Sequence, residues 1–146
     1  MAQAEEPLFM AVDAESDAYL QTIAQAHASL AGFKQALQAL PEGDLACVKF
    51  FVPESPDASE GAYLWLMHPE FSEGFCYAKP FELPENFSWI QVGQWLKFSE
   101  DSLLDWYLLS ESGEMHGGFS LRYQREQLPE DQRASFDARI GVRQYL

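Results

Sequence analysis

Apolar side chains recur at spacings of three and four near the start of the chain, which predicts an amphipathic helix that ends before Pro41. Asp13, Ser16 or Asp17 can cap its start, because their side-chain oxygens can accept a backbone N–H. Gly32 predicts a bend or a break, because glycine costs about 1 kcal/mol relative to alanine inside a helix. The apolar stripe of this helix consists of Leu20, Ile23, His27, Leu30, Phe33, Leu37 and Leu40.

The hydrophobic period changes to two after the turn residues at 41–44, which predicts about six short strands. Val48, Phe50 and Val52 form one face of the first of them. Prolines and glycines separate the later strands, and Glu73-Gly74 indicates a bulge or a turn. The strand candidates are Asp44–Val52, Gly61–His68, Phe71–Lys79, Ser88–Val92, Trp95–Phe98, Leu103–Leu109 and Met115–Tyr123.

A short helix is predicted at the end of the chain, from Pro129 to about Ala138. Proline suits the first turn of a helix, and the acidic residues that follow it suit the helix dipole. The order of elements therefore predicts an α+β protein. In this prediction the N-terminal amphipathic helix packs on a curled antiparallel sheet, as in an SH3-like or partly open barrel, and the short helix is C-terminal.

The length of the chain predicts one domain that spans residues 1–146, with residues 1–12 as a loose leader. Hydrophobic residues make up 47% of the chain, so it can form a core without disulfide bonds. Apolar runs extend over only a few residues, and the start is acidic where a signal peptide would be basic. The sequence therefore predicts a soluble, cytoplasmic protein.

The net charge of the chain limits the classes of macromolecule that it can bind. Nine Lys and Arg against 23 Asp and Glu give a formal net charge of −14. Nucleic acids and anionic membranes attract basic surfaces, so both are disfavoured as partners. The last segment, residues 121–146, differs from the rest because its five arginines balance its four acidic residues. The acidic excess has two interpretations, solubility or the attraction of a basic protein partner.

Cysteine and histidine give no signal for a metal or a cofactor. Cys47 and Cys76 are 29 residues apart without a CxxC pair. A disulfide between them is possible, although buried free thiols are favoured in a cytoplasmic chain. His27, His68 and His116 do not stand at zinc-ligand spacing, and no sequence motif for a nucleophile or a phosphate loop is present.

Two short clusters stand out around a predicted hairpin turn. Asp105 and Trp106 precede the turn, and Gly117 and Gly118 follow it. Paired glycines allow a positive φ or the close approach of another group. One interpretation is structural, with the missing side chains letting a tryptophan pack flat. The other is functional, with a ligand or a partner backbone lying over the glycines.

These clusters, with the Ser112-Gly113 turn and the run Met115–Arg122, resemble the motif of the bacterial domain of unknown function 2314, the YegJ-like family. The chain departs from that motif at Phe119 and Ser120, where tyrosine and threonine are usual, and in an acidic insert at about residues 53–60. The resemblance covers roughly residues 24–140. It implies the order of the elements, and it implies no catalytic residue.

Three functional hypotheses follow. The leading one is a non-enzymatic domain that binds a basic protein, and its most specific form is an immunity protein that neutralises a basic toxin. The second is an aromatic groove at Trp106, Gly117 and Gly118 that binds a peptide or a small ligand. The third is an enzyme without a recognisable motif, with His68, His116 and Asp105 as candidates. The first hypothesis places the contacts in two acidic loops, at Glu54, Asp57, Glu60, Glu70 and Glu73.

Overall fold

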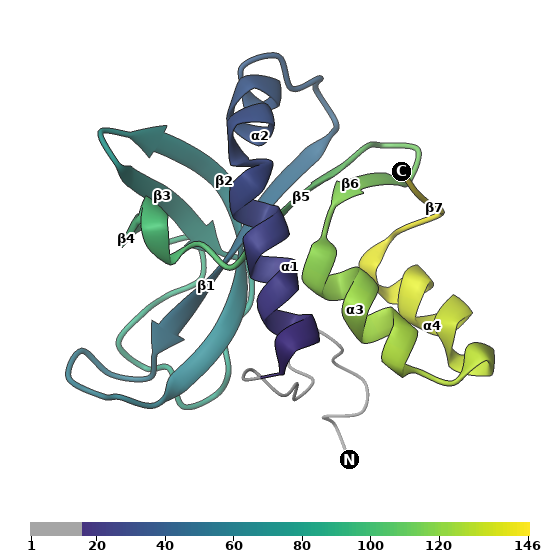
Figure 1. Cartoon of the computed structure of the whole chain (residues 1–146). Helices are drawn as coiled ribbons and strands as arrows, with labels where there is room; N and C mark the ends of the chain where they lie inside the picture. Colours follow the sequence, from purple (N-terminus) through teal and green to yellow (C-terminus); the bar gives the residue numbers. More distant parts are fainter. Residues whose placement is uncertain (1–15) are drawn as a thin grey trace.

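The computed structural model describes residues 16–146 and shows four α-helices and one seven-stranded sheet (Figure 1). The predicted α+β class is confirmed. The expected leader at residues 1–12 and the expected cap at Asp13 lie outside the described residues. Within the described residues, no helix is long and apolar enough to cross a membrane.

The sheet is open and mixed, in the order β4-β3-β2-β1-β5-β6-β7. Neighbouring strands are antiparallel except β6 and β7, which are parallel. The end strands β4 and β7 do not pair with each other, so the sheet is open, and the SH3-like form of the expected fold is not confirmed. The strands are β1 (Leu45–Pro53), β2 (Gly61–Ser72), β3 (Phe75–Pro80), β4 (Leu96–Ser99), β5 (Asp105–Leu109), β6 (Glu114–Gly117) and β7 (Gln144–Tyr145).

One strand prediction is wrong and another ends too early, because spacing alone does not define a ladder. The predicted strand Ser88–Val92 is a series of turns between β3 and β4. Phe87 and Ile90 of this loop pack beside Val52 of β1, so a spacing of three buries them. The second predicted strand, Gly61–His68, continues past Pro69 as β2, because a bulge at this point removes the need for an N–H in the ladder.

The predicted strand Met115–Tyr123 is wrong in its second half. The strand β6 ends at Gly117, and α3 begins at Phe119. Gly117 and Gly118 have φ values of 76° and 66°, which extended backbone does not adopt. Apolar and polar residues alternate after Gly118, but these residues form a helix and not a strand. The helices are α1 (Asp17–Ala28), α2 (Leu30–Leu37), α3 (Phe119–Gln127) and α4 (Glu130–Ile140), with a short 3-10 turn, η3 (Glu100–Ser102).

The N-terminal helix breaks at Ser29, three residues before the expected break at Gly32. The Ser29 hydroxyl donates to the Gln25 carbonyl at 2.8 Å, a local bond that competes with the helix ladder. The buried face also differs from the predicted stripe in α1, because Leu20 is 48% exposed and His27 is exposed. The residues of the two helices that the core buries are Tyr19, Thr22, Ala26, Leu30 and Phe33.

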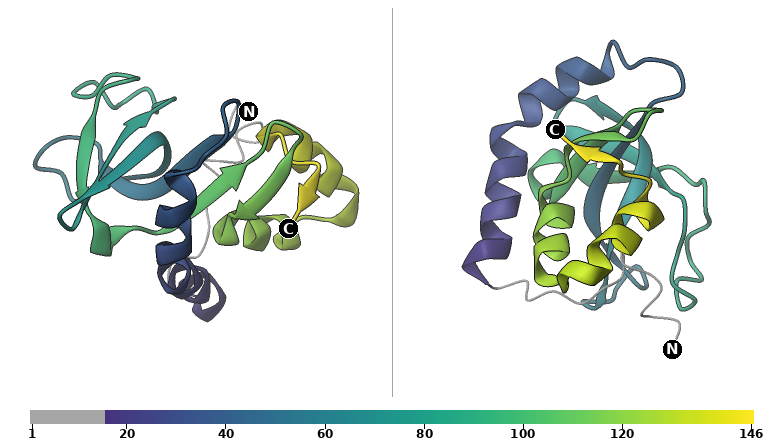
Figure 2. Two further views of the ribbon diagram at one scale, coloured as in Figure 1. Left: turned by 90° about the horizontal axis from the view of Figure 1, so that it is seen from above. Right: turned by 90° about the vertical axis from the view of Figure 1, so that its right-hand side faces the viewer.

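The two faces of the sheet carry separate hydrophobic clusters. On one face, Val48 and Phe50 of β1 pack with residues of α1 and α2 such as Phe33. On the other face, Trp65 of β2 packs with residues of α3 and α4 such as Phe136. Figure 2 shows α3 and α4 lying over this second face. These helices cover the part of this face that lies around Trp65 and Tyr107.

The cysteines confirm the prediction of buried free thiols. Cys47 belongs to the cluster under α3 and α4, and Cys76 belongs to the cluster under α1 and α2. Burial raises the pKa of each thiol to about 12, so both stay protonated at neutral pH.

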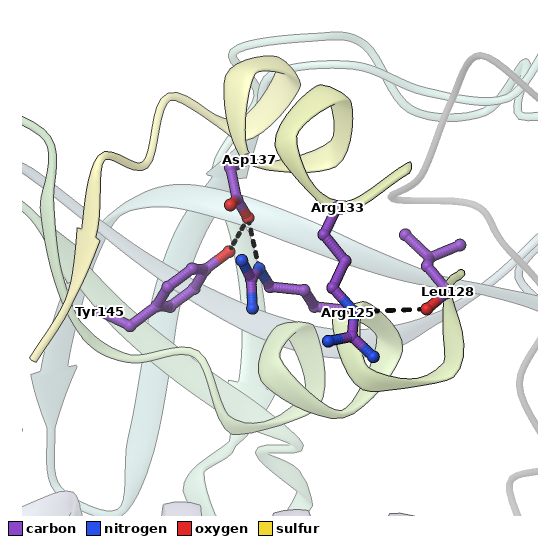
Figure 3. Close-up of polar contacts among 5 residues, drawn as sticks. All are labelled: Arg125, Leu128, Arg133, Asp137 and Tyr145. Atoms are coloured by element: carbon purple, nitrogen blue, oxygen red, sulfur yellow. Dashed lines mark hydrogen bonds and ion pairs between the residues drawn. The ribbon is translucent and has the colours of Figure 1, made fainter. Parts of the chain in front are cut away.

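Polar contacts of Asp137 hold the C-terminal segment together (Figure 3). Its Oδ1 atom accepts from Arg125 Nε at 2.8 Å and from the Tyr145 hydroxyl at 2.6 Å, so one carboxylate joins α3, α4 and β7. Arg133 Nε donates to the Leu128 carbonyl at 3.3 Å, at the turn between the two helices. The bond to Asp137 raises the pKa of Arg125. These arginines therefore serve the fold of their own segment.

The glycine pair gives a direct test of the turn into α3. A Cβ atom at Gly117 would lie 2.6 Å from Cε3 and Cζ3 of the Trp106 ring and from its backbone carbonyl oxygen. We expect Gly117→Ala to lower the free energy of unfolding by about 2–4 kcal/mol, because backbone strain and overpacking add. Urea unfolding of the full chain measures this change.

Substitutions at two other glycines separate the effect of backbone strain from the effect of overpacking. Gly74 also has a positive φ, of 86°, but has no atom within 4 Å of an added Cβ, so Gly74→Ala should lose only about 1–2 kcal/mol. Gly32 lies in α2 with open space around it, so Gly32→Ala should add about 0.5–1 kcal/mol. A loss at Gly117 no larger than the loss at Gly74 would contradict the packing argument.

Candidate functional site

Asp105 is a fully buried carboxylate that caps α3 from a neighbouring strand. It lies at the start of β5 and is 0% exposed. Its oxygens accept from the backbone N–H groups of Phe119 at 3.2 Å and Ser120 at 2.7 Å, and from the Ser120 hydroxyl at 2.6 Å. They also accept from the Trp106 N–H at 2.8 Å. Because the first N–H groups of a helix have no partner within it, this carboxylate supplies what the first turn of α3 lacks.

Lys49 faces Asp105 across the pair of strands β1 and β5, where the two residues are partners in register. Its side chain is enclosed, with the residue only 4% exposed. The ammonium donates to the Ser120 hydroxyl at 3.2 Å and to the Tyr19 hydroxyl at 3.3 Å. Its Nζ atom also lies 5.3–5.9 Å from the ring centroids of Tyr19, Tyr63 and Trp65. The lysine therefore links β1 to both α1 and α3.

Burial acts on the pKa values of this pair in opposite directions. It lowers the pKa of Lys49 to about 8, and the charge of Asp105 opposes that shift. It raises the pKa of Asp105, against the effect of the Ser120 hydrogen bonds and of Lys49. Since Lys49, Asp105 and Ser120 are all less than a tenth exposed, this cluster holds elements together and has no surface to offer a ligand.

Trp106 and Gly117 form a second set of contacts, which joins β5 and β6 to the break between α1 and α2. The indole Nε1 donates to the Ser29 hydroxyl at 3.1 Å, at the break between α1 and α2. The Trp106 ring stacks on Phe33 with centroids 4.6 Å apart, and Gly117 leaves room for its other edge. The Gly118 N–H donates to the Trp106 carbonyl at 2.7 Å. The structure thus brings Asp105, Trp106, Gly117 and Gly118 together, as the sequence indicated, and gives each a structural contact.

A groove of about 600 Å³ adjoins this cluster between α1 and α3. Trp106 and Gly117 line it, whereas Asp105 and Gly118 do not. Arg122 contributes to its wall and donates to the carbonyls of Gly117 at 2.7 Å and Leu146 at 2.8 Å. Burial lowers the pKa of Arg122. The other lining residues are Ala18, Gln21, Thr22, Gln25, Ser29, His116, Phe119, Tyr123, Glu126 and Leu146.

The three residues proposed for an enzyme do not converge. His116 is exposed and pairs with Leu108, so it lies on the face of the sheet opposite to Asp105. His68 is exposed at the bulge of β2, with a φ of 57°. Within residues 16–146, no group of three or more His, Cys, Asp or Glu side chains is placed to hold a metal ion.

The acidic candidates form two separate surfaces. Glu54, Asp57 and Glu60 lie in the loop before β2, and Glu70 and Glu73 lie near the opposite end of that strand (Figure 1). All five are exposed except Glu54, which is half-buried and accepts from the Asn86 side chain. None of them forms an ion pair within the described residues, where the pairs are Lys34–Glu100 and Arg125–Asp137.

Sequence reasoning missed the partners of Asp105, above all Lys49, Tyr19 and Ser120. One signal was present, because Lys49 stands in the apolar strand between Val48 and Phe50. A charged side chain at such a position needs a buried partner. The identity of that partner depends on the register of β1 against β5, which local sequence does not specify.

Comparison with protein families gives a match that covers most of the chain. A family model described as "Uncharacterized protein conserved in bacteria (DUF2314)" matches residues 16–143. No curated protein and no solved structure matches the chain. The match covers every helix of the structure and six of its seven strands.

Substitutions at the buried pair test its role. We expect Asp105→Asn to lower the free energy of unfolding by about 3–5 kcal/mol, because it leaves Lys49 without a charge partner and presents an amide N–H₂ to donors. Lys49→Met should lose less, about 1–2 kcal/mol, because the carboxylate keeps its four donors and methionine can fill the aromatic surroundings. Chemical denaturation of both variants measures the difference, and an equal or reversed order would contradict the capping role.

The pH dependence of stability tests the burial of the Lys49 charge. Its pKa is about 8 in the folded chain and about 10.5 in the unfolded chain, so above pH 8 the unfolded state holds more protons. The free energy of unfolding of the wild type should therefore rise relative to Lys49→Met, by about 2 kcal/mol between pH 7 and pH 10. Comparison of the two proteins cancels the contribution of the cysteines. If the stability difference between the wild type and Lys49→Met stays constant or falls over this pH range, the lysine is not buried in its charged form.

Proposed function

The chain belongs to the DUF2314 family of uncharacterised bacterial proteins, and we propose that it is a non-catalytic binding domain whose acidic loops engage a basic protein. The observation that carries the proposal is the set of exposed carboxylates at both ends of β2. Asp57, Glu60, Glu70 and Glu73 are exposed and lack a cationic partner among residues 16–146. A surface of this kind speeds association with a basic partner and disfavours acidic ones.

The distribution of charge supports this proposal. Residues 16–120 contain 15 acidic and four basic side chains, while residues 121–146 contain four acidic and five basic ones. In Figure 1 the acidic loops lie on the side of the molecule away from α3 and α4. Of the arginines in this last segment, Arg122, Arg125 and Arg133 donate to groups of the chain itself. The molecule is therefore polarised, with its negative side free for a partner.

A specific form of this proposal is an immunity protein, a small cytoplasmic antidote that covers a basic toxin. The buried free thiols at Cys47 and Cys76 are consistent with a reducing compartment. Inhibition by coverage needs surface complementarity and no catalytic group, which agrees with the separation of His68, His116 and Asp105.

A second candidate function is favoured by the groove between α1 and α3. Its aromatic side chains and the Arg122 guanidinium are suited to a peptide or a small ligand. Both candidates can be compared in one experiment, because the groove and the acidic loops contain no residue in common.

The experiment begins with a tagged protein in its native host, at low and at high salt, with mass spectrometry of the retained proteins. The paired variants Asp57→Asn/Glu60→Gln and Glu70→Gln/Glu73→Gln then lose two charges each. We expect at least one of them to lower the association rate with the purified partner about 3- to 10-fold, and to weaken its salt dependence.

A matched control is Glu130→Gln/Asp131→Asn, which removes the same charge from the exposed start of α4. It should leave the association rate within about twofold of the wild type. Equal effects of all three variants would show that net charge acts without a defined surface. Loss of binding in Gln25→Tyr, which obstructs the groove, with normal binding in the loop variants would favour the groove instead.

A further inference from the structure

The loop between β3 and β4, residues 81–95, presents aromatic side chains to solvent from a fixed position. Phe87 and Ile90 anchor it, because they are 5% and 3% exposed and pack with Val52 and Leu64. Trp89 and Trp95 of the same loop are 39% and 46% exposed. Exposed tryptophan on an anchored segment is typical of a binding surface, since little conformational entropy is lost on contact.

Trp89 is held beside the first acidic loop, residues 53–60. Its indole Nε1 donates to the Pro53 carbonyl at 3.1 Å, and the nearby Asn86 side chain donates to Glu54. Figure 1 shows the loop after β1 and the loop after β3 on the same side of the sheet. The exposed carboxylates of Asp57 and Glu60 belong to the same acidic loop. An aromatic ring and uncompensated negative charge therefore occur together.

Two other exposed aromatic side chains, Trp95 and Phe75, already have a lysine over their rings. Lys79 Nζ lies 4.4 Å from the ring centroid of Trp95, and Lys97 Nζ lies 4.1 Å from that of Phe75. Trp89 has no such cation among the described residues. Its ring is thus a place where a cation from outside the chain can bind.

We propose that Trp89 and the acidic loop 53–60 form the docking surface for an arginine side chain of the basic partner. This inference rests on the proposed function and adds its anchor. A guanidinium fits better than an ammonium, because it is planar, stacks on an indole and is more weakly hydrated. The carboxylates of Asp57 and Glu60 supply the opposite charge around the ring.

The second acidic surface is less suited to this role because it has its own cation. Lys34 pairs with Glu100 at 2.6 Å and lies 5.1 Å from the ring centroid of Phe71. Both residues line the shallow pocket that also contains Glu70 and Glu73. The partner would have to displace Lys34 there, whereas Trp89 needs no displacement.

The test is a titration of the 15N-labelled full chain with a hexa-arginine peptide, followed by NMR. The chain has four indole N–H signals, and that of the buried Trp65, which lines neither surface, serves as the internal reference. We expect the Trp89 indole and the amides of residues 53–60 to shift with one dissociation constant. Hexa-lysine should bind more weakly, because ammonium groups stack poorly.

The variants separate the ring from the charge. Trp89→Ala should weaken hexa-arginine binding about fivefold, while Trp89→Phe, which keeps a ring, should retain most of the affinity. Trp95→Ala is the matched control, since Trp95 is similarly exposed but already covered by Lys79, and it should change the affinity less than about twofold. Thermal unfolding of each variant verifies that the fold is intact.

Three outcomes would overturn the inference. Shifts in residues 53–60 without a shift of Trp89 would leave an acidic surface without the tryptophan anchor, and the proposed function would stand. Shifts centred on residues 70–74 would place the docking surface at the other end of β2. No shift at any site would remove both the anchor and the affinity for basic groups on which the proposed function depends.

Discussion

The Asp105 carboxylate performs a task that the sequence of α3 cannot perform for itself. The residue before the helix is Gly118, which has no side chain to cap it. Asp105 reaches the first turn from β5 and accepts from the N–H groups of Phe119 and Ser120. A helix end buried without such acceptors would leave unpaired donors in the core. The placement of α3, and of the α4 segment that packs beside it, depends on this one group.

The same carboxylate offsets the charge of the buried Lys49, and Lys49 in turn contacts α1. Lys49 balances the charge of Asp105 and donates to Ser120 of α3 and Tyr19 of α1. Four elements therefore meet at one polar cluster inside a hydrophobic core. The motif that contains Asp105-Trp106 and Gly117-Gly118 therefore specifies the fold. The two positive φ values turn the chain, and the Asp105 carboxylate caps the helix that follows.

The sequence predicted the elements whose periodicity is local. The first strand, the turn at Glu73-Gly74 and the C-terminal helix after Pro129 were all anticipated, because each depends on neighbouring residues. The start of α3 was not, because residues after Gly118 alternate in a way that suits a strand as well as a helix. The buried pair was not predicted either, since it depends on the register between β1 and β5.

Hydrogen exchange in the Asp105→Asn variant tests the capping role most directly. If the carboxylate holds α3, the amides of Leu121–Gln127 should lose protection in the variant, while the paired amides of β1 and β2 keep theirs relative to the global stability. Such a pattern would show that α3 separates from the sheet before the rest unfolds. Equal protection of α3 in the variant and the wild type, or an identical loss across all elements, would contradict the claim that Asp105 places this helix.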